Sequence, residues 1–295
     1  MGNEVSYWAP GDEEARIEAR DYPNAHIFPV KRPRSWFRSP ELARALDAAA
    51  EAGINLVDTA ECYGDHLSER LIGDYLDRRD RSRWIVATKF GHHFHSFMRR
   101  TEDFSPEDVR RQLEGSLQAL RVDRIDLYQF HSGPDAAFLN DDLWEMLRRE
   151  QAAGKIAYLG ISILGKGSEL QAREAARVGA GALQVIYNRL DRRPEQTVFP
   201  YAEKDGLGIL ARVPLASGLL SGKYTTAEFP PNDVRSTFDR KKIKADLAAV
   251  EEIKRSEVPP GVPLSRWALA WCLRNPRVTA VIPGCKDPDQ VRANA

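Results

Sequence analysis

Polar side chains gather directly after three successive β-branched runs of the chain. Asp58 and Tyr63 follow the first of these runs, Lys89 follows the second, and His131 follows the third. A phenol can protonate the alkoxide that forms when a carbonyl is reduced, but its ordinary pKa near 10 makes it a weak donor. A neighbouring ammonium lowers that pKa, and a carboxylate holds the ammonium in place. We therefore predict that Tyr63 donates a proton with help from Lys89 and Asp58.

An imidazole at His131 would hydrogen-bond the carbonyl oxygen and stabilise its developing negative charge. Taken singly, an Asp, Lys or His is more readily explained by a structural ion pair or hydrogen bond. The prediction depends on their joint placement after neighbouring runs. Hydride must come from a cofactor, because no side chain supplies it.

The elements that position these groups are short apolar runs alternating with longer amphipathic stretches, a pattern typical of strand-helix units and a parallel sheet. Seven strands are expected, at Ile54–Val57, Trp84–Ala87, Ile125–Phe130, Ile156–Ile161, Leu183–Ile186, Gly208–Ala211 and Thr279–Ile282. A weaker eighth candidate precedes them at His26–Val30. Helices are expected from Ser39 to Ala52 and from Ser105 to Leu120, because each serine is followed by proline and acidic residues.

This alternation predicts an α/β protein with a (β/α)8 TIM barrel in a single domain. We assign residues 39–295 to the barrel and residues 1–38 to an atypical N-terminal segment that includes its start. The competing architecture, an open doubly wound sheet, would need a glycine-rich phosphate fingerprint, and no GxGxxG is present. Barrel active sites lie at the C-terminal strand ends, where the four polar residues fall. The chain ends inside the predicted last helix, which we expect to be truncated.

Composition argues against large charged partners. The 43 basic and 43 acidic residues cancel, so no overall field attracts nucleic acid or an anionic membrane. Residues 1–6 match a myristoylation template, but a single acyl chain binds a membrane only marginally, and we predict no membrane partner. The three cysteines lack the spacing of a zinc or redox motif, which favours a reduced, cytoplasmic location. The oligomeric state stays open.

Three histidines and one cysteine near the expected site need a separate interpretation. His92, His93 and His95 cluster after a strand, but no carboxylate or cysteine stands at a spacing that completes a recognisable metal site. We therefore predict no metal and expect these histidines to line the mouth of the substrate pocket. Cys62, beside Tyr63, is expected to serve packing.

From Gly53 to Asn294 the chain resembles an aldo-keto reductase of bacterial type. The resemblance is carried by GINLVDTAECYG, ATKFG, LYQFHSG, LQVIYN, VPLASGLLSGKY and VIPGCKDPDQVRAN, all in the family's order. The family's catalytic tetrad falls on Asp58, Tyr63, Lys89 and His131, the residues that strand placement selects. The resemblance implies reduction of a small aldehyde or ketone to an alcohol with NADPH.

The same resemblance implies a nicotinamide site. Ser162 and Gln184 would hold the carboxamide. Arg212 stands where many members stack a Tyr or Trp on the nicotinamide ring, and a planar guanidinium can stack there too. Ile163 replaces a usual Asn, so one carboxamide contact is expected to be lost.

The phosphates and the adenosine would be bound further along the chain. The long loop at 216–235 interrupts the strand-helix pattern, and a loop of this length in a barrel is expected to be functional. The segment from Pro214 to Lys223 would hold the pyrophosphate, through Pro214, Leu215, Ser217, Gly218, Ser221 and Lys223. The adenosine end would meet Gly284, Lys286, Gln290 and Asn294. Lys286, helped by Arg235, would favour NADPH over NADH.

Other interpretations remain open. The cofactor residues have ordinary alternatives as strand-end polar groups, turn residues and solvated charges. A non-catalytic NADPH-binding regulatory protein, resembling the cytoplasmic β-subunits of potassium channels, would share most of these motifs. Such subunits generally replace the tetrad histidine, whereas His131 is present, so we favour an enzyme. A third alternative is a degenerate barrel whose pocket is closed by its N-terminal segment.

Overall fold

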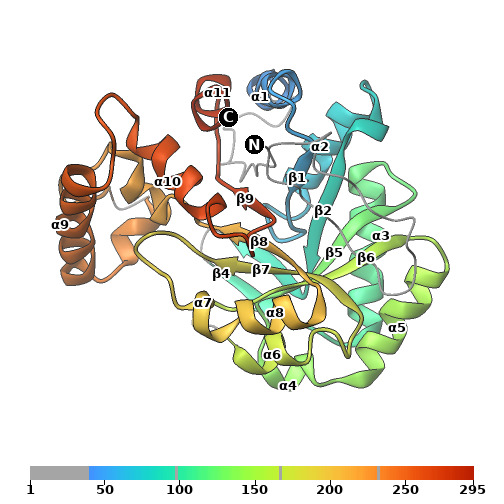
Figure 1. The fold of residues 1–295 in the computed structure, drawn as a ribbon. Coiled ribbons are helices and arrows are strands. Elements are labelled where there is room, and N and C mark those ends of the chain that lie inside the picture. Colours follow the sequence, from blue (N-terminus) through green and yellow to red (C-terminus); the bar gives the residue numbers. More distant parts are fainter. Residues whose placement is uncertain (1–39, 97–98, 166–167, 231–232) are drawn as a thin grey trace.

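The computed structural model of the chain describes residues 40–96, 99–165, 168–230 and 233–295. Its main sheet has seven parallel strands, in the order β1 (Leu56–Asp58), β2 (Ile85–Phe90), β5 (Ile125–His131), β6 (Ile156–Ser162), β7 (Ala180–Ile186), β8 (Gly208–Arg212) and β9 (Ala280–Ile282). The seven expected strands are confirmed. The sheet curls into a nearly closed barrel with helices outside it, as a (β/α)8 barrel requires (Figure 1). The eighth candidate, at His26–Val30, lies outside the described residues.

The register of the strands explains why polar groups collect at one end of the barrel. Lys89 pairs with Gln129, and Ser162 pairs with Gln184. Since side chains alternate across a strand, paired residues and those two positions away share a face. The inner face begins with an apolar layer made of Leu56, Ala87, Leu127, Ala182, Leu210 and Ala280. Two residues further along, the inward positions of these strands are polar or charged, except on β9, where Ile282 is apolar.

Gly160 leaves room for one of these polar side chains. A Cβ at this position would lie 3.0 Å from Gln129 Cγ and 3.0 Å from Leu127 Cδ1. Both distances are tighter than ordinary packing allows. The glycine on β6 therefore allows Gln129 to extend across the barrel interior.

The helices lie outside the sheet. They are α1 (Pro40–Glu51), α2 (Leu67–Leu76), α3 (Pro106–Leu120), α4 (Asp135–Phe138), α5 (Asp141–Ala152), α6 (Glu169–Arg173), α7 (Pro194–Thr197), α8 (Phe199–Asp205), α9 (Arg240–Ser256), α10 (Leu264–Leu273) and α11 (Pro288–Asn294). Both predicted helices are confirmed as α1 and α3. The Ser105 side chain accepts a hydrogen bond from the Asp108 backbone at 3.4 Å and caps α3. No described helix is long and apolar enough to cross a membrane.

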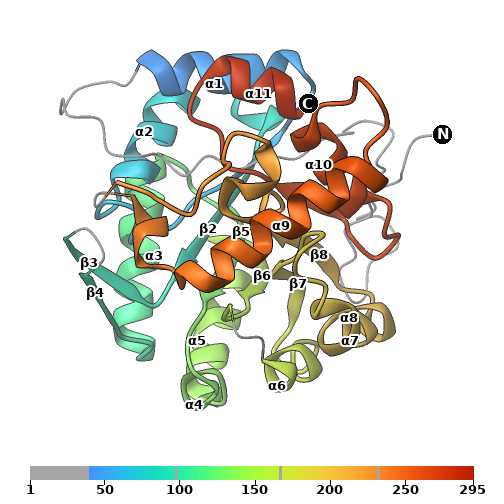
Figure 2. The same cartoon turned by 90° about the vertical axis from the view of Figure 1, so that its left-hand side faces the viewer.

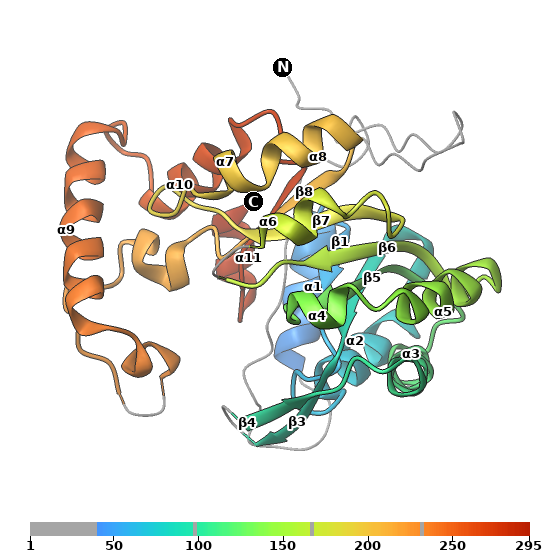
Figure 3. The same cartoon turned by 90° about the horizontal axis from the view of Figure 1, so that it is seen from below.

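Two features were not predicted. An antiparallel hairpin, β3 (His92–Ser96) and β4 (Arg99–Glu102), stands between β2 and α3 and lies beside α3 in Figure 2. Its polar, histidine-rich sequence gives no apolar alternation to recognise. Helix α9 packs with α10 and the loop at 216–221 in a second apolar cluster. Figure 3 shows α9 and the hairpin projecting from the barrel at separate places.

Candidate active site

The four predicted catalytic residues come together at the C-terminal ends of β1, β2 and β5. Asp58 ends β1, Lys89 lies near the end of β2, His131 ends β5, and Tyr63 follows in the loop after β1. The Lys89 ammonium donates to the Asp58 carboxylate and, at 2.7 Å, to the Thr59 carbonyl oxygen. Burial lowers the pKa of Lys89, but Asp58 and Tyr63 together raise it by more, so the net shift is upward. Lys89 is therefore charged.

The second oxygen of Asp58 is held by side chains from β5 and β7. Asp58 Oδ1 accepts hydrogen bonds from Gln129 Nε2 at 2.8 Å and from Gln184 Nε2 at 2.7 Å. Gln184 Nε2 also donates to Gln129 Oε1 at 3.0 Å. Sequence reasoning missed Gln129. Its position two residues before His131 on the same strand was the signal that it points inward.

Tyr63 lies next to the ammonium. Lys89 Nζ is 5.3 Å from the centre of the Tyr63 ring. Burial raises the pKa of Tyr63 and Lys89 lowers it, and the net shift is upward. The lysine thus acts in the expected direction, but burial outweighs it, because an ionised phenolate is poorly solvated there. Tyr63 is consequently a protonated phenol at neutral pH and is available as an acid.

His131 faces the same phenol. The rings of Tyr63 and His131 have centres 6.0 Å apart and are nearly perpendicular. Burial, assisted by the charge of Lys89, lowers the pKa of His131 well below its ordinary value, so the imidazole is neutral. His131 Nδ1 lies 3.8 Å from Cys62 Sγ. Burial raises the pKa of Cys62 to about 12, so this partner is a thiol.

Glu61 is a second residue that sequence reasoning missed. It is only 3% exposed, and burial raises its pKa to about 8. One carboxyl oxygen accepts from the His92 backbone at 3.0 Å, and the other has no partner among the described atoms. Candidate ligand atoms of Glu61, Cys62 and His131 lie within 4.8 Å of one another. A carboxylate in a loop gives no sequence signal of such burial.

The three histidines of the hairpin make separate contacts. His92 is 1% exposed and its Nε2 donates to the His131 carbonyl oxygen at 2.6 Å, so it is buried against the backbone of the site and does not line a mouth. His93 Nε2 pairs with Asp108 Oδ2 at 2.6 Å. His95 Nε2 lies 2.9 Å from Thr101 Oγ1. Their sequence cluster is therefore divided over different partners.

The residues predicted for the nicotinamide lie on neighbouring strands in the same polar layer. Ser162 Oγ donates to Gln184 Oε1 over a long 3.4 Å. Arg212, at the end of β8, donates through a terminal nitrogen to the Ile163 carbonyl oxygen at 3.1 Å, while its buried Nε has no partner among the described atoms. Burial lowers the pKa of Arg212. Both the weak serine bond and the orphaned Nε leave polar capacity for a planar amide-bearing ligand.

The segment predicted for the pyrophosphate curls tightly after β8. Ala216, Ser217 and Gly218 have φ values of 48°, 55° and 93°. Successive residues near the left-handed region can turn backbone N–H groups into an anion-binding concavity. Ser221 Oγ donates to the Gly218 carbonyl oxygen at 2.5 Å, and Lys223 is exposed. Pro214 is buried and Leu215 is partly buried at the start of the curl.

Arg235 holds this loop. It donates to the Ser217 carbonyl oxygen at 3.2 Å, and its guanidinium lies 4.1 Å from the centre of the Tyr224 ring. It also forms an ion pair with Asp233 at 2.5 Å. A Cβ on Gly218 would lie 3.2 Å from the Arg235 side chain. The pair with Asp233 offsets the charge that the sequence assigned to phosphate selectivity.

The residues predicted for the adenosine end lie just before α11 and within it. The Lys286 backbone donates to Gln290 Oε1 at 3.2 Å, and Asn294 Nδ2 lies 3.2 Å from Cys285 Sγ. Gly284 and Lys286 are exposed. Within the described parts of the chain, Lys286 forms no ion pair, so its charge is available to a ligand.

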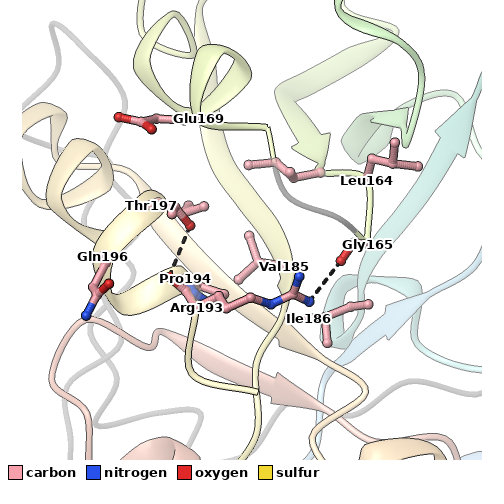
Figure 4. Close-up of a pocket in the computed structure, with 11 residues that line it drawn as sticks. Leu164, Gly165, Glu169, Val185, Ile186, Arg193, Pro194, Gln196 and Thr197 are labelled. Atoms are coloured by element: carbon pink, nitrogen blue, oxygen red, sulfur yellow. Dashed lines mark hydrogen bonds between the residues drawn. The ribbon is translucent and has the colours of Figure 1, made fainter. Parts of the chain in front are cut away.

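A cavity of about 270 Å³ opens beside this site, at the ends of β6 and β7. Figure 4 shows Arg193 reaching across it toward Gly165, to whose carbonyl oxygen it donates at 3.2 Å. Ile163 and Ile186 contribute apolar walls. None of the four tetrad residues lines this cavity, so it is a neighbour of the polar layer and not its mouth.

Comparisons with known proteins agree with this arrangement. The family model described as "Aldo/keto reductase family" matches residues 34–295. The uncharacterized oxidoreductase YrpG of Bacillus subtilis is 31% identical over 84% of this chain and 79% of its own length. The NADH-specific methylglyoxal reductase of Escherichia coli is 28% identical over 88% of this chain and 84% of its own.

A solved structure extends the likeness to the fold. The glycerol dehydrogenase AKR11B4 from Gluconobacter oxydans is 28% identical and superposes with a TM-score of 0.80, covering 98% of this chain and 88% of its own. A barrel with an Asp, Tyr, Lys and His at its C-terminal end, matched by the family model over residues 34–295, leads to one conclusion. The chain belongs to the aldo/keto reductase family of oxidoreductases.

Proposed function

We propose that this protein reduces an aldehyde or ketone to an alcohol, using NADPH as hydride donor and Tyr63 as proton donor. The observation that carries the proposal is the buried Lys89–Asp58 pair beside a protonated Tyr63 phenol. Family membership supports an oxidoreductase that uses a nicotinamide cofactor. The tetrad roles are our assignment from the geometry.

The residues present fit a nicotinamide cofactor. Ser162 and Gln184 would hold its carboxamide, and Arg212 offers a flat guanidinium at the next strand end. The curled segment from Pro214 to Lys223 would hold its pyrophosphate. When bound, the cofactor supplies hydride to the carbonyl carbon.

The chain's own residues then handle the carbonyl oxygen. The neutral imidazole of His131 can donate a hydrogen bond to it and orient the substrate. As negative charge grows on that oxygen, Tyr63 transfers its phenolic proton. Lys89 stabilises the resulting phenolate, and Asp58 keeps the ammonium in position. A nascent alkoxide is a far stronger base than a phenolate, so this transfer is downhill even with the raised pKa of Tyr63.

We propose that the cofactor is NADPH and not NADH because of Lys286. Its exposed ammonium at the start of α11 can meet the additional phosphate of NADPH. The E. coli relative, by its name, is NADH-specific. This preference is therefore a property to measure in this chain. We place the protein in the cytoplasm because its three cysteines are free thiols.

The test is NADPH oxidation, followed by absorbance, against a panel of aldehydes, ketones and oxidised sugars. Carbonyl-dependent oxidation that is absent from a Tyr63→Phe preparation is the expected result. Tight NADPH binding with no oxidation across the whole panel would contradict the proposal and favour the regulatory alternative. Absence of NADPH binding would favour the degenerate barrel.

A further inference from the structure

The proposed reaction uses only one member of a buried cluster beside Tyr63. The cluster consists of Glu61, Cys62 and His131, whose candidate ligand atoms all lie within 4.8 Å of one another. Glu61 is 3% exposed, and the other two residues are each 7% exposed. Cys62 Sγ and His131 Nδ1 are 3.8 Å apart. The loop after β1 and the end of β5 thus bring a carboxyl, a thiol and an imidazole together.

Glu61 leaves this cluster with an unsatisfied oxygen. Its Oε1 accepts from the His92 backbone at 3.0 Å, whereas its buried Oε2 has no hydrogen-bond partner among the described atoms. Glu61 also forms no ion pair with any residue that the structure describes. Lys89, the ammonium of the site, is already paired with Asp58. Burying an oxygen without a partner costs free energy, and a ligand bound at that oxygen would recover it.

The three side chains form a ligand set that suits zinc. Zinc binds thiolate, imidazole and carboxylate groups, whereas magnesium and calcium prefer oxygen ligands. At ordinary zinc–sulfur and zinc–nitrogen lengths, two tetrahedral ligand atoms are about 3.5 Å apart. The 3.8 Å between Cys62 Sγ and His131 Nδ1 is close to that separation. The Glu61 carboxyl needs a shift on the order of 1 Å to complete a three-ligand site.

The charges of such a complex balance. The Glu61 carboxyl and the Cys62 thiol release the protons they carry to the solvent as the ion enters, because zinc binds the deprotonated forms. The carboxylate and the thiolate then offset the two positive charges of the ion. The third ligand, His131, binds as a neutral imidazole. The occupied site therefore carries no net charge, which is the favourable state for a buried cluster.

We propose that Glu61, Cys62 and His131 form a binding site for one zinc ion, and that the bound ion reversibly inhibits carbonyl reduction. Zinc binding is independent of the function proposed above, and only its effect on turnover rests on that function. Glu61 and Cys62 directly precede Tyr63, so drawing them onto an ion changes how the phenol lies against His131. The sequence led us to expect no metal, because Cys62 and His131 are 69 positions apart.

Metal titrations test the site without any turnover. The full-length protein, freed of metal and kept reduced, is titrated with zinc in competition with a chromophoric chelator. We expect one zinc ion per chain with a Kd of about 10 μM or tighter, and no binding of magnesium. Cobalt replaces zinc as a spectroscopic probe. Its complex should show the charge-transfer absorption of a thiolate–cobalt bond and the intense visible bands of a four-coordinate ion.

Four variants locate the site. Cys62→Ser should abolish the thiolate–cobalt absorption. Cys62→Ser and Glu61→Gln, both close to the parent in shape, should each raise the zinc Kd by about 100-fold or more, since losing a ligand costs more than losing a supporting partner. Cys272→Ser is the matched control, because Cys272 is also a buried free thiol. His93→Asn removes a member of the other described cluster of possible metal ligands. Both controls should bind zinc as the parent does.

Turnover measurements complete the test. Carbonyl-dependent NADPH oxidation by the parent should fall by about tenfold or more at saturating zinc, because small displacements of a catalytic group are costly. It should return when EDTA removes the ion. Each variant is compared with itself in the presence and absence of zinc, and the inhibition should be lost in Cys62→Ser and Glu61→Gln.

Four other results would each overturn the inference. They are a zinc Kd weaker than about 10 μM, unchanged zinc binding in Cys62→Ser, loss of zinc binding in His93→Asn, and full turnover by the zinc-loaded protein. A protein that oxidises no NADPH with any carbonyl would instead reject the proposed function. The zinc and cobalt titrations would then still decide whether the cluster binds metal.

Discussion

The Lys89 ammonium and the Asp58 carboxylate form an ion pair in which each side chain is 1% exposed. The pair is completed by groups from other strands, since Asp58 also accepts from Gln129 and Gln184. Removing one partner of a buried pair leaves an uncompensated charge, which is far worse than removing both. Replacing both residues should therefore cost less stability than replacing one. Catalysis should not recover in the same way, because it needs the Lys89 ammonium itself.

Lys89→Met should reduce the free energy of unfolding by about 3–5 kcal/mol, because Asp58 is left buried and unpaired. Adding Asp58→Asn should restore most of that stability, since an amide needs no counter-charge. Urea denaturation of the two single variants and the double variant provides the measurement. Turnover should stay low in the two variants that lack Lys89, because neither places an ammonium beside Tyr63. A double variant less stable than either single variant would mean that the two residues do not act as a pair.

Tyr63→Phe should lose turnover by about 10²–10⁴-fold, the usual contribution of a positioned general acid. The phenyl ring keeps the packing, so NADPH affinity by fluorescence titration should match that of the parent protein. The Tyr75→Phe variant provides the control. That phenol binds Asp47 on the outer face of the barrel, so Tyr75→Phe should leave kcat unchanged. Undiminished turnover in Tyr63→Phe would remove this residue from the mechanism.

Much of this arrangement could be predicted from the sequence, because period and spacing determine it. A polar residue two positions after an apolar one, on several strands, predicts a polar layer above an apolar one, as in Ala87 and Lys89. Capping chemistry at Ser105 predicts where α3 begins. These signals are local and need no knowledge of tertiary contacts.

The rest depends on contacts that no local pattern encodes. The β3–β4 hairpin could not be predicted, because its strands have no apolar alternation. Glu61 is buried where its carboxyl meets the His92 backbone, a contact between residues far apart in the sequence. Arg235 has the charge expected of a phosphate ligand, yet its neighbour Asp233 takes that charge. Such pairings become visible only in three dimensions.

Lys286→Ala should weaken NADPH binding and leave NADH binding nearly unchanged. Lys286 is exposed and forms no ion pair within the described residues, so its removal disturbs no structural contact. The expected loss is about tenfold or more in Kd, from one charge-assisted contact to phosphate. Fluorescence titrations with both cofactors measure it. Lys254→Ala, on the solvent face of α9, is the control. Equal weakening of both cofactors would place Lys286 elsewhere on the nucleotide.

Glu61 should make the stability of the protein depend on pH in a defined direction. Its folded pKa of about 8 lies above the ordinary 4.5 because the carboxyl is buried. Between these two values the unfolded carboxyl is ionised while the folded one keeps its proton. Folding therefore takes up a proton, and the contribution of Glu61 to stability falls as pH rises from 4.5 to 8.

Glu61→Gln removes this titration while keeping a neutral side chain of similar shape. Urea denaturation at several pH values from 5 to 8 should show the free energy of unfolding of the parent falling relative to the variant, by a few kcal/mol in total, since each pKa unit is worth about 1.4 kcal/mol. Any constant offset between the proteins reflects packing and not ionisation. His92, whose pKa is lowered to about 4, titrates in both proteins and cancels from the difference. Parallel curves would mean that Glu61 is ionised in the folded protein, which would place an anion next to His131 and alter the charge balance at the site.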